Sequence, residues 1–316
     1  MIGLTFRGFS AKRKIQDFNR FIAIVSIGNK GMNNIGSFPK ILKVHWNCYG
    51  VCNLGCGFCY GLFEGYPALG TSEGIEILRK VSTEGVETFV FAGGDPLLRS
   101  DLKELMSFGR ELGLKIELQT NAHSLTEQKI EELFPLIDCW GFSLDSSVDE
   151  IHDSERKGRG NYQRVTNAIR ILAGRKANLN VRTVVSKRTA ASVHRISNIL
   201  RNFDFHGKWY LLQYDPLGDE KHNRDQFEIS RCSFDEVVTR ITSDISFCEN
   251  EFKTIAVPYA IREGIYFLIA PDGSVYNQPP AGEDYRVVGN ILYDNFWTLA
   301  DRLQINFELH YKRYAS

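Results

Sequence analysis

The chain has 316 residues, and its 38 basic and 38 acidic side chains give a formal net charge of zero, so global charge indicates no class of partner. Hydrophobic residues make up 43% and charged residues 24%, as in ordinary globular proteins. Seven cysteines, mostly without paired spacing, do not match a secreted disulfide framework and favour a reducing cytosol. No apolar run approaches the roughly 20 residues that cross a bilayer, so we expect a cytoplasmic protein without a membrane segment.

Residues 1–40 are expected to form an N-terminal extension. The basic run Lys12-Arg13-Lys14 precedes an apolar run at 21–27, an order that resembles a signal peptide. The apolar part is short, however, and no small-residue cleavage pattern follows it. We therefore interpret the run as a helix or strand that closes one end of the domain, followed by a glycine-rich linker at 28–36.

Residues 41–231 alternate between apolar runs typical of strands and stretches with helical periodicity. The predicted strands are 41–46, 88–92, 115–119, 139–144, 179–185 and 209–213. The predicted helices are about 72–84, 100–112, 126–134, 161–173 and 190–202. Repeated strand–helix units imply a parallel sheet with right-handed crossovers. The expected fold class is therefore α/β, a partial (β/α)6 TIM barrel.

Polar or glycine-rich segments follow all six predicted strands. In α/β barrels the ligand and catalytic residues lie at the carboxyl ends of the strands. The sequence therefore places a functional site at this end of the barrel. From residue 232 the pattern changes to a helix near 233–247, short strands, a hairpin turn at 271–274 and a helix at 296–304. Residues 232–316 are expected to form a short α+β extension that caps the barrel.

The loop after the first strand carries three cysteines, Cys52, Cys56 and Cys59, with glycines between and around them. Thiolates are soft ligands that favour zinc and iron–sulfur clusters. A structural zinc site or an electron-transfer cluster normally has four protein ligands. Three cysteines would leave one metal position open for a group that is not protein. A zinc loop completed by a distant fourth ligand is the alternative.

The pattern CxxxCxΦC, in which the aromatic residue is Phe58, resembles the motif of the radical S-adenosylmethionine (SAM) superfamily. The resemblance implies a [4Fe-4S] cluster on the three cysteines, with SAM bound to the open iron. It also implies reductive cleavage of SAM to a 5′-deoxyadenosyl radical that abstracts hydrogen from substrate. The resemblance extends over about 41–292, and the branch it suggests includes MoaA, viperin and SPASM-type peptide maturases. No cysteine lies beyond Cys248, so we expect one cluster and an extension of the SPASM or twitch type without cluster cysteines.

The resemblance also implies which residues contact SAM. Gly93-Gly94-Asp95-Pro96 resembles the GGEP motif that binds the SAM amino group, with aspartate in place of glutamate. Polar contacts with the ribose and carboxylate are expected from Asn121, Ser143, Asp145 and Arg156, the arginine because its fork binds a carboxylate bidentately. The candidates for an apolar adenine slot are Phe58, Val185 and Leu212.

The segment 156–202 has twelve Lys and Arg and no Asp or Glu. Most of these side chains fit a solvated basic face, but Lys187 and Arg188 directly follow a strand at the expected active end. A local field of one sign attracts anions, so an anionic substrate is predicted. Candidate substrate contacts are His45, Lys187, Arg188 and Tyr214.

Two enzymatic interpretations remain open at this stage. Viperin-like enzymes dehydrate nucleoside triphosphates, but the positions that would hold the phosphates on strands five and six are Asn180 and Tyr210 here. The alternative substrate is a ribosomally made peptide. A non-enzymatic alternative is a zinc- or cluster-stabilised binding protein. For the enzyme we expect an electron donor such as flavodoxin or ferredoxin and neither a nucleic acid nor a membrane as a partner.

Overall fold

The computed structural model describes residues 40–59, 66–216, 223–245, 252–258, 264–278 and 285–315. The chain divides into two compact units, Met1–Pro39 and Lys40–Ser316, and only the second is described below. The apolar run at 21–27 and Cys248 lie outside the described residues. Within the described ranges, no helix has the length and apolar character needed to cross a membrane.

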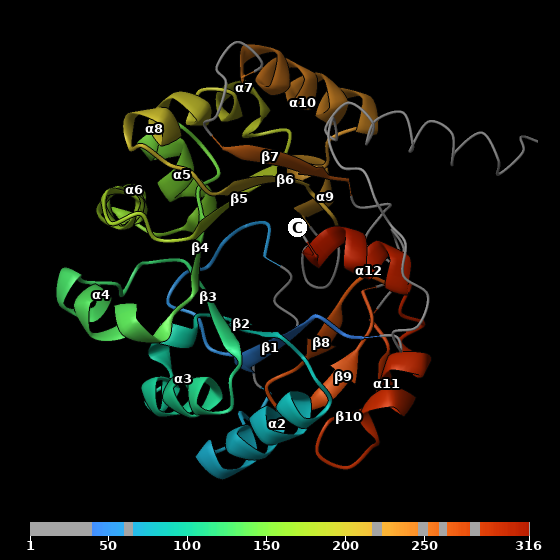
Figure 1. Cartoon of the computed structure of the whole chain (residues 1–316). Coiled ribbons are helices and arrows are strands. Elements are labelled where there is room, and N and C mark those ends of the chain that lie inside the picture. Colours follow the sequence, from blue (N-terminus) through green and yellow to red (C-terminus); the bar gives the residue numbers. More distant parts are fainter. Residues whose placement is uncertain are drawn as a thin grey trace, which may run out of the picture. The chain divides into compact units, whose positions relative to one another are not determined.

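Six neighbouring parallel strands form the centre of the sheet, in the order in which they occur in the chain. The strands are β1 (Lys43–Tyr49), β2 (Thr88–Gly93), β3 (Lys115–Thr120), β4 (Cys139–Ser143), β5 (Leu179–Val185) and β6 (Lys208–Gln213). Figure 1 shows the sheet curving so that its helices lie on the outer side. The prediction of an α/β fold built as an open barrel is confirmed, and the parallel part of the sheet extends beyond the six predicted strands by one strand at each edge.

Helices connect the strands across the outer side of the sheet (Figure 1). They are α2 (Thr71–Thr83), α3 (Leu102–Glu111), α4 (Glu127–Leu133), α5 (Asp149–Arg156), α6 (Asn161–Gly174), α7 (Ala190–Val193) and α8 (Ile196–Asn202), with the short 3-10 helices η1 (Pro96–Leu98) and η2 (Phe134–Leu136). Sequence reasoning did not predict α5, which is short and carries a polar sequence. The single helix predicted at 190–202 is interrupted at His194–Arg195, between α7 and α8.

The residues after 223 extend the same sheet at both edges. Helices α9 (Arg224–Phe227) and α10 (Arg231–Ile245) lead to β7 (Lys253–Val257), which pairs in parallel with β6. Strand β8 (Phe267–Ile269) pairs in parallel with β1 at the opposite edge. Strands β9 (Ser274–Tyr276) and β10 (Val287–Asn290) continue that edge in antiparallel fashion, and helices α11 (Phe296–Arg302) and α12 (Phe307–Tyr314) follow.

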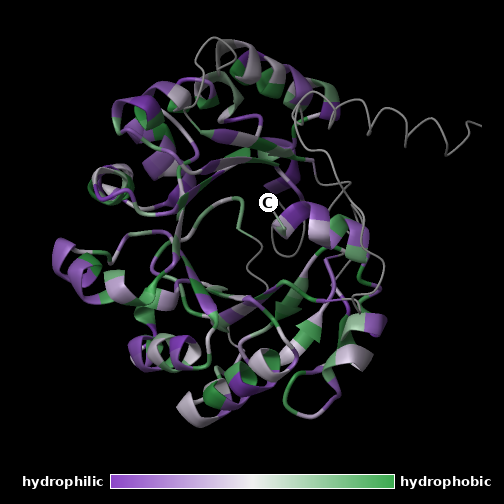
Figure 2. Cartoon of the chain, in the orientation of Figure 1, coloured by the Kyte–Doolittle hydropathy of each residue, from purple (hydrophilic) through white to green (hydrophobic). Residues whose placement is uncertain are grey.

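The two faces of the sheet differ in chemistry. On the outer face, Trp46 and Phe91 are fully buried, and Trp46 and Leu105 both approach Gly74 of α2. Figure 2 shows green and purple residues alternating along the outer helices, as expected for helices with one buried face. Because successive strand residues point to opposite faces, Lys43 and His45 of β1 lie on the inner face.

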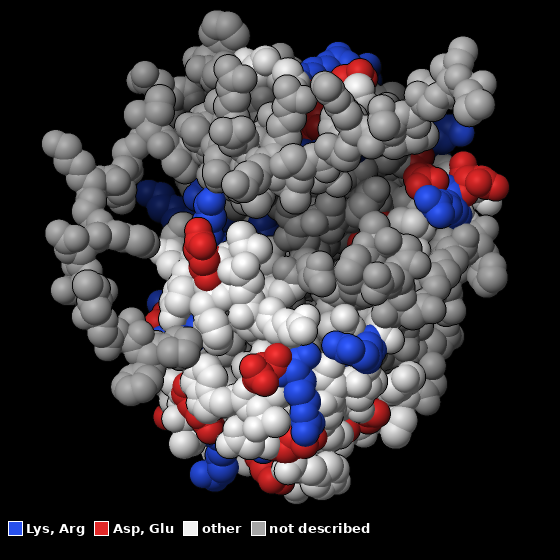
Figure 3. Space-filling view, turned by 90° about the vertical axis from the view of Figure 1, so that its right-hand side faces the viewer, with Lys and Arg blue, Asp and Glu red and all other residues white. Residues whose placement is uncertain are grey.

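Charges on the molecular surface are mixed. On the face drawn in Figure 3, the described basic and acidic side chains are interspersed rather than separated by sign. This arrangement agrees with the net charge of zero.

Candidate active site

The cysteine loop directly follows β1 and is held by backbone hydrogen bonds. The Cys59 amide donates to the carbonyl of Cys56 at 3.2 Å, which forms a tight turn. The Gly57 amide donates to the carbonyl of Glu155 at 2.9 Å, which ties the loop to the last turn of α5. The helix that sequence reasoning missed therefore positions the cysteines.

The Gly93-Gly94-Asp95-Pro96 turn packs against the backbone that leads into the cysteine loop. The amide of Gly94 donates to the carbonyl of Tyr49 at 2.7 Å, and that of Asp95 to the carbonyl of Val51 at 2.9 Å. A Cβ atom at Gly94 would lie 2.2 Å from the Val51 carbonyl oxygen. Gly93 has a φ of 136°, which a side chain would strain. Both glycines are therefore needed to bring the two loops together.

The Asp95 carboxylate is buried and accepts hydrogen bonds from three protein donors. These donors are the Leu97 amide at 2.9 Å, the Thr120 hydroxyl at 2.8 Å and the Asn121 amide at 2.8 Å. Burial raises the pKa of Asp95, and the donors oppose that shift. Asp95 thus caps η1, in which Pro96 is the first residue, and fixes Asn121 at the end of β3.

The three thiols of the cysteine loop lie close enough to influence one another. Burial raises the pKa of Cys52 and raises that of Cys56 to about 12; the charge of Cys59 adds to both increases, and that of Cys52 adds to the second. Within the described ranges, no three His, Cys, Asp or Glu side chains are placed to bind one metal ion.

The polar residues predicted at the ends of β3 and β4 lie beside the cysteine loop. The Asn121 side-chain amide lies 3.4 Å from Cys52 Sγ. Arg156 Nε donates to Asp145 Oδ2 at 2.7 Å, and Arg156 Nη1 lies 3.9 Å from Cys56 Sγ. Ser143 is half-buried at the last position of β4.

Two of the three apolar candidates belong to the main hydrophobic core. Phe58 is buried, meets the ring of Phe227 edge-on at 6.1 Å, and lies 5.4 Å from the Arg156 guanidinium. Val185 is fully buried in the main hydrophobic core. Leu212 is half-buried, two residues after Tyr210, and therefore lies on the inner face of the sheet. Phe58 and Val185 therefore belong to the same hydrophobic core, and the adenine slot stays a prediction.

Three of the four candidate substrate contacts, Lys187, Arg188 and Tyr214, lie around Phe227, and His45 lies apart from them. Lys187 is exposed, and its amide donates to the carbonyl of Phe227 at 3.0 Å. Arg188 forms an ion pair with the buried carboxylate of Glu155. Tyr214 is buried and packs against the ring of Phe227 at 5.7 Å. Arg188 is therefore already paired with a carboxylate of the protein.

A buried ionic cluster on the inner face was missed by sequence reasoning. Glu117 of β3 is 1% exposed and pairs with both Lys43 of β1 and Arg182 of β5, each at 2.7 Å. Burial alone would raise the pKa of Glu117, but the two cations hold it far below its usual value. The strict alternation of side chains along β1, β3 and β5 could have indicated this interior cluster, which consists of Lys43, Glu117 and Arg182.

The last helix, α12, closes on the interior cluster. His310 Nε2 accepts from the Leu42 amide at 2.8 Å, and the Tyr311 hydroxyl accepts from the Lys40 amide at 2.7 Å. The hydroxyl of Tyr314 lies 3.1 Å from Nε2 of His45. Burial lowers the pKa of His45 to about 3, so this ring is neutral at physiological pH. His45 therefore faces the barrel interior.

Comparison with known proteins assigns the family. Residues 46–195 match the family model of the radical SAM superfamily. The chain contains a radical SAM domain. The S-adenosylmethionine-dependent nucleotide dehydratase of Selenomonas ruminantium is 24% identical over 288 residues, which cover 86% of this chain and 98% of that protein. The AdoMet-dependent heme synthase of Methanosarcina barkeri is 30% identical over 159 residues, 49% of this chain and 45% of the synthase.

Solved radical SAM structures share the fold. SuiB of Streptococcus suis superposes with a TM-score of 0.67 at 15% identity, covering 97% of this chain and 79% of SuiB. The structure of anSMEcpe with bound AdoMet and Kp18Cys peptide superposes with a TM-score of 0.63 at 19% identity, covering 86% of this chain and 82% of anSMEcpe. At these identities the likeness establishes the radical SAM fold.

The protein is a radical SAM enzyme, and this superfamily uses a [4Fe-4S] cluster and SAM. The residues at the carboxyl end fit such a cluster. Three thiols lie on one loop, within range of each other's charge, and two of them face N–H donors. Cys52, Cys56 and Cys59 could therefore hold three irons and leave the fourth open for SAM.

Proposed function

We propose that this radical SAM enzyme acts on an anionic small molecule bound inside the barrel, and that a nucleotide is the favoured class. Cys52, Cys56 and Cys59 would hold the cluster, which together with SAM would supply the radical chemistry for hydrogen abstraction from the substrate. The residues of this chain then have to hold the substrate, orient it toward the cysteine loop and exclude water.

The proposal rests on one observation, a side-chain nitrogen of Arg182 that has no hydrogen-bond partner. Its Nη2 pairs with Glu117, but its buried Nη1 has no hydrogen-bond partner. Gly141 of β4 leaves room for this group, because a Cβ there would lie 2.4 Å from Nη1. A buried, unpaired donor atom on a cation is costly and is best satisfied by an acceptor on an anionic ligand.

The charge around Arg182 supports an anion. Lys43 lies on the same face, and the Arg313 guanidinium lies 4.6 Å from the centroid of the Tyr210 ring. The cations Lys43, Arg182 and Arg313 outnumber Glu117, the carboxylate that they share in the interior, while Glu308 of α12 is exposed. Neither Asn180 nor Tyr210 has to supply the positive charge that a phosphate needs, because Arg182 on β5 can do so.

The relatives favour a nucleotide over other anions. The match to the nucleotide dehydratase spans 98% of that protein, whereas the match to the heme synthase spans 45% of the synthase. A tetrapyrrole with carboxylate side chains is the second candidate, since its carboxylates could also bind Arg182. A peptide substrate remains the third.

The test begins with anaerobically reconstituted protein that contains about four iron atoms per chain. With dithionite and SAM, 5′-deoxyadenosine is measured with and without ATP, GTP, CTP or UTP. We expect one nucleotide to raise its yield at least about tenfold. A yield that no nucleotide changes would remove the nucleotide class, and iron–coproporphyrin III would then be tested in the same assay.

The matched variants are Arg182→Gln and Arg170→Gln. Arg170 is exposed on α6 and bonds to Asn167, so its loss should leave the nucleotide response unchanged. Arg182→Gln should raise the KM for the nucleotide by roughly 10–100-fold, because a charge-assisted contact is worth about 1.5–3 kcal/mol. Equal KM values for the two variants would contradict the assignment of Arg182.

A further inference from the structure

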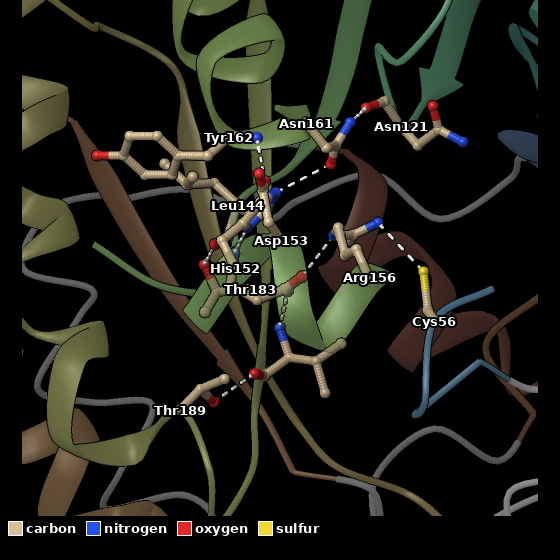
Figure 4. A network of polar contacts seen from close by, with 12 residues as sticks. Cys56, Asn121, Leu144, His152, Asp153, Arg156, Asn161, Tyr162, Thr183 and Thr189 are labelled. Atoms are coloured by element: carbon tan, nitrogen blue, oxygen red, sulfur yellow. Dashed lines mark hydrogen bonds and ion pairs between the residues drawn. The ribbon is translucent and has the colours of Figure 1, made fainter. Parts of the chain in front are cut away.

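Two of the three cysteine sulfurs face N–H donors from different elements. Asn121 Nδ2 donates to Cys52 Sγ at 3.4 Å, and Arg156 Nη1 donates to Cys56 Sγ at 3.9 Å. Both donors are at least nine-tenths buried. Figure 4 shows Arg156 of α5 reaching toward Cys56. Both contacts are directed at atoms that would become cluster ligands.

Arg156 is held in this orientation by a buried carboxylate. Its Nε donates to Asp145 Oδ2 at 2.7 Å, while Asp145 Oδ1 accepts from the Val184 amide at 2.8 Å. Asp145 is fully buried. The carboxylate is thus fixed from β5, and it fixes the guanidinium in turn.

A second series of hydrogen bonds also starts at Asp145 and leads to Asn121. The Asp145 amide donates to Nδ1 of His152 at 3.2 Å, so Nδ1 carries no proton and Nε2 carries it. Nε2 therefore donates to Oδ1 of Asn161 at 3.0 Å, and Nδ2 of Asn161 donates to the carbonyl of Asn121 at 2.9 Å. Both series of hydrogen bonds thus begin at Asp145 and end at a cysteine sulfur. Figure 4 shows the contacts of His152 with Asn161 and of Asn161 with Asn121.

We propose that this sulfur-donor network, Asn121, Asp145, His152, Arg156 and Asn161, sets the reduction potential of the cluster. The inference rests on the proposed cluster site at the three cysteines. Hydrogen bonds to cluster sulfurs and local charge are the factors by which a protein adjusts this potential. Reduction adds negative charge to the cluster. N–H donors and a cation at Cys56 therefore favour the reduced state, and the Asp145 carboxylate opposes them. These residues act as positioning residues through the ligand sulfurs.

The ion pair of Arg156 and Asp145 allows a test in which two variants should shift the potential in opposite directions. Removing the cation in Arg156→Gln should make the midpoint potential more negative. Removing the carboxylate in Asp145→Asn keeps an acceptor for the Val184 amide and should make the potential less negative. We expect each shift to reach about a tenfold change in the reduction equilibrium, which is about 59 mV for one electron. The potential is read from the electron paramagnetic resonance signal of the reduced cluster during redox titration without SAM.

Lys157 provides the matched control. It follows Arg156 in the chain and carries the same charge, but it is exposed and its side chain lies beside Gly55. Lys157→Gln should shift the potential less than half as far, because water screens its charge. Iron content and circular dichroism of each variant establish that the cluster and the fold are retained.

Shifts of the same sign in Arg156→Gln and Asp145→Asn, or shifts no larger than that of Lys157→Gln, would overturn the proposal. If Arg156→Gln fails to bind iron, Arg156→Lys and Asp145→Asn are used instead. The midpoint potential of Arg156→Lys should be more negative than that of the wild type, and that of Asp145→Asn should be less negative. A wild-type protein that binds no cluster would instead overturn the proposed function. The two failures are therefore distinguishable.

Discussion

The carboxyl end of the barrel and the barrel interior hold their polar groups in different ways. At the carboxyl end, loops next to each other supply neutral donors and one ion pair, and the groups point at the cysteine sulfurs. In the interior, Lys43, Glu117 and Arg182 come from three separate strands and satisfy mainly one another. We propose that the first arrangement holds the cofactor, while the second contributes to the fold and has one unpaired donor, Arg182 Nη1, which we propose for the ligand.

This contrast explains how mutations should act at each place. A change among the cysteines should remove chemistry and leave the fold intact, because the cysteine loop lies partly at the surface. A change in the interior should reduce stability first, because a buried charge without its partner is costly. The following experiments test this division.

The largest loss is expected at the carboxyl end. Cys56→Ser should reduce iron content and lower 5′-deoxyadenosine formation by more than about 100-fold, beyond the 10–100-fold effect of residues that only support metal ligands. The control is Cys232→Ser, an exposed cysteine on α10. The denaturation midpoint of the metal-free variant should match that of the metal-free wild type. A Cys56→Ser protein with full iron content would contradict the cluster assignment.

A large effect on stability is expected in the interior. Glu117→Gln leaves the half-buried cations Lys43 and Arg182 without their buried carboxylate and should lower the free energy of unfolding by about 3 kcal/mol. Urea denaturation measures this difference. The control is Glu132→Gln, whose partner Lys103 is largely exposed, and it should change stability little. If both variants have the same free energy of unfolding, the interior cluster contributes no more to stability than the exposed ion pair of Glu132.

The sequence predicted the two regions to different extents, for a physical reason. The cysteines and Gly93-Gly94-Asp95-Pro96 are local patterns, so their positions and the six parallel strands could be predicted without coordinates. The interior cluster depends on which strand positions face inward and on the register between β1, β3 and β5. A shift by one residue reverses that direction, so periodicity alone does not specify the pairs.

Sequence reasoning also missed how the site is supported. Helix α5 is short and polar, and only its contacts with the cysteine loop reveal its role. The expectation that Arg188 is available for substrate did not consider Glu155, which is 33 residues away in the chain. The predicted contacts of Asn121, Asp145 and Arg156 with SAM remain predictions, and the contacts that are present join them to the cysteines and to one another.

The pH dependence of stability sharpens the contrast further. Burial, with smaller contributions from Lys43 and Arg182, lowers the pKa of His45 from 6.5 to about 3. The unfolded chain takes up a proton below pH 6.5 and the folded chain does not. Stability from neutral His45 is therefore present above pH 6.5 and is lost as the pH falls toward 3.

At pH 5 this linkage should lower the free energy of unfolding by about 2 kcal/mol relative to pH 7. Urea denaturation at both pH values measures the difference, and His45→Gln should reduce it. The control is His206→Gln, an exposed histidine beside Asp204. An unchanged difference in His45→Gln would show that other groups control the acid sensitivity of the interior.

The smallest effect is expected where α12 meets the interior. Tyr314→Phe removes the hydroxyl that lies 3.1 Å from His45 Nε2 and should cost about 1 kcal/mol, the usual net value of one buried hydrogen bond. The ring remains beside Lys43, so packing is preserved and the loss isolates the hydroxyl. Tyr293→Phe, at a side chain that is 85% exposed, is the control. If Tyr314→Phe changes the free energy of unfolding no more than this control, α12 is held by His310 and Tyr311 at the amino end of β1. The stability of the interior would then not depend on Tyr314, the last residue of α12.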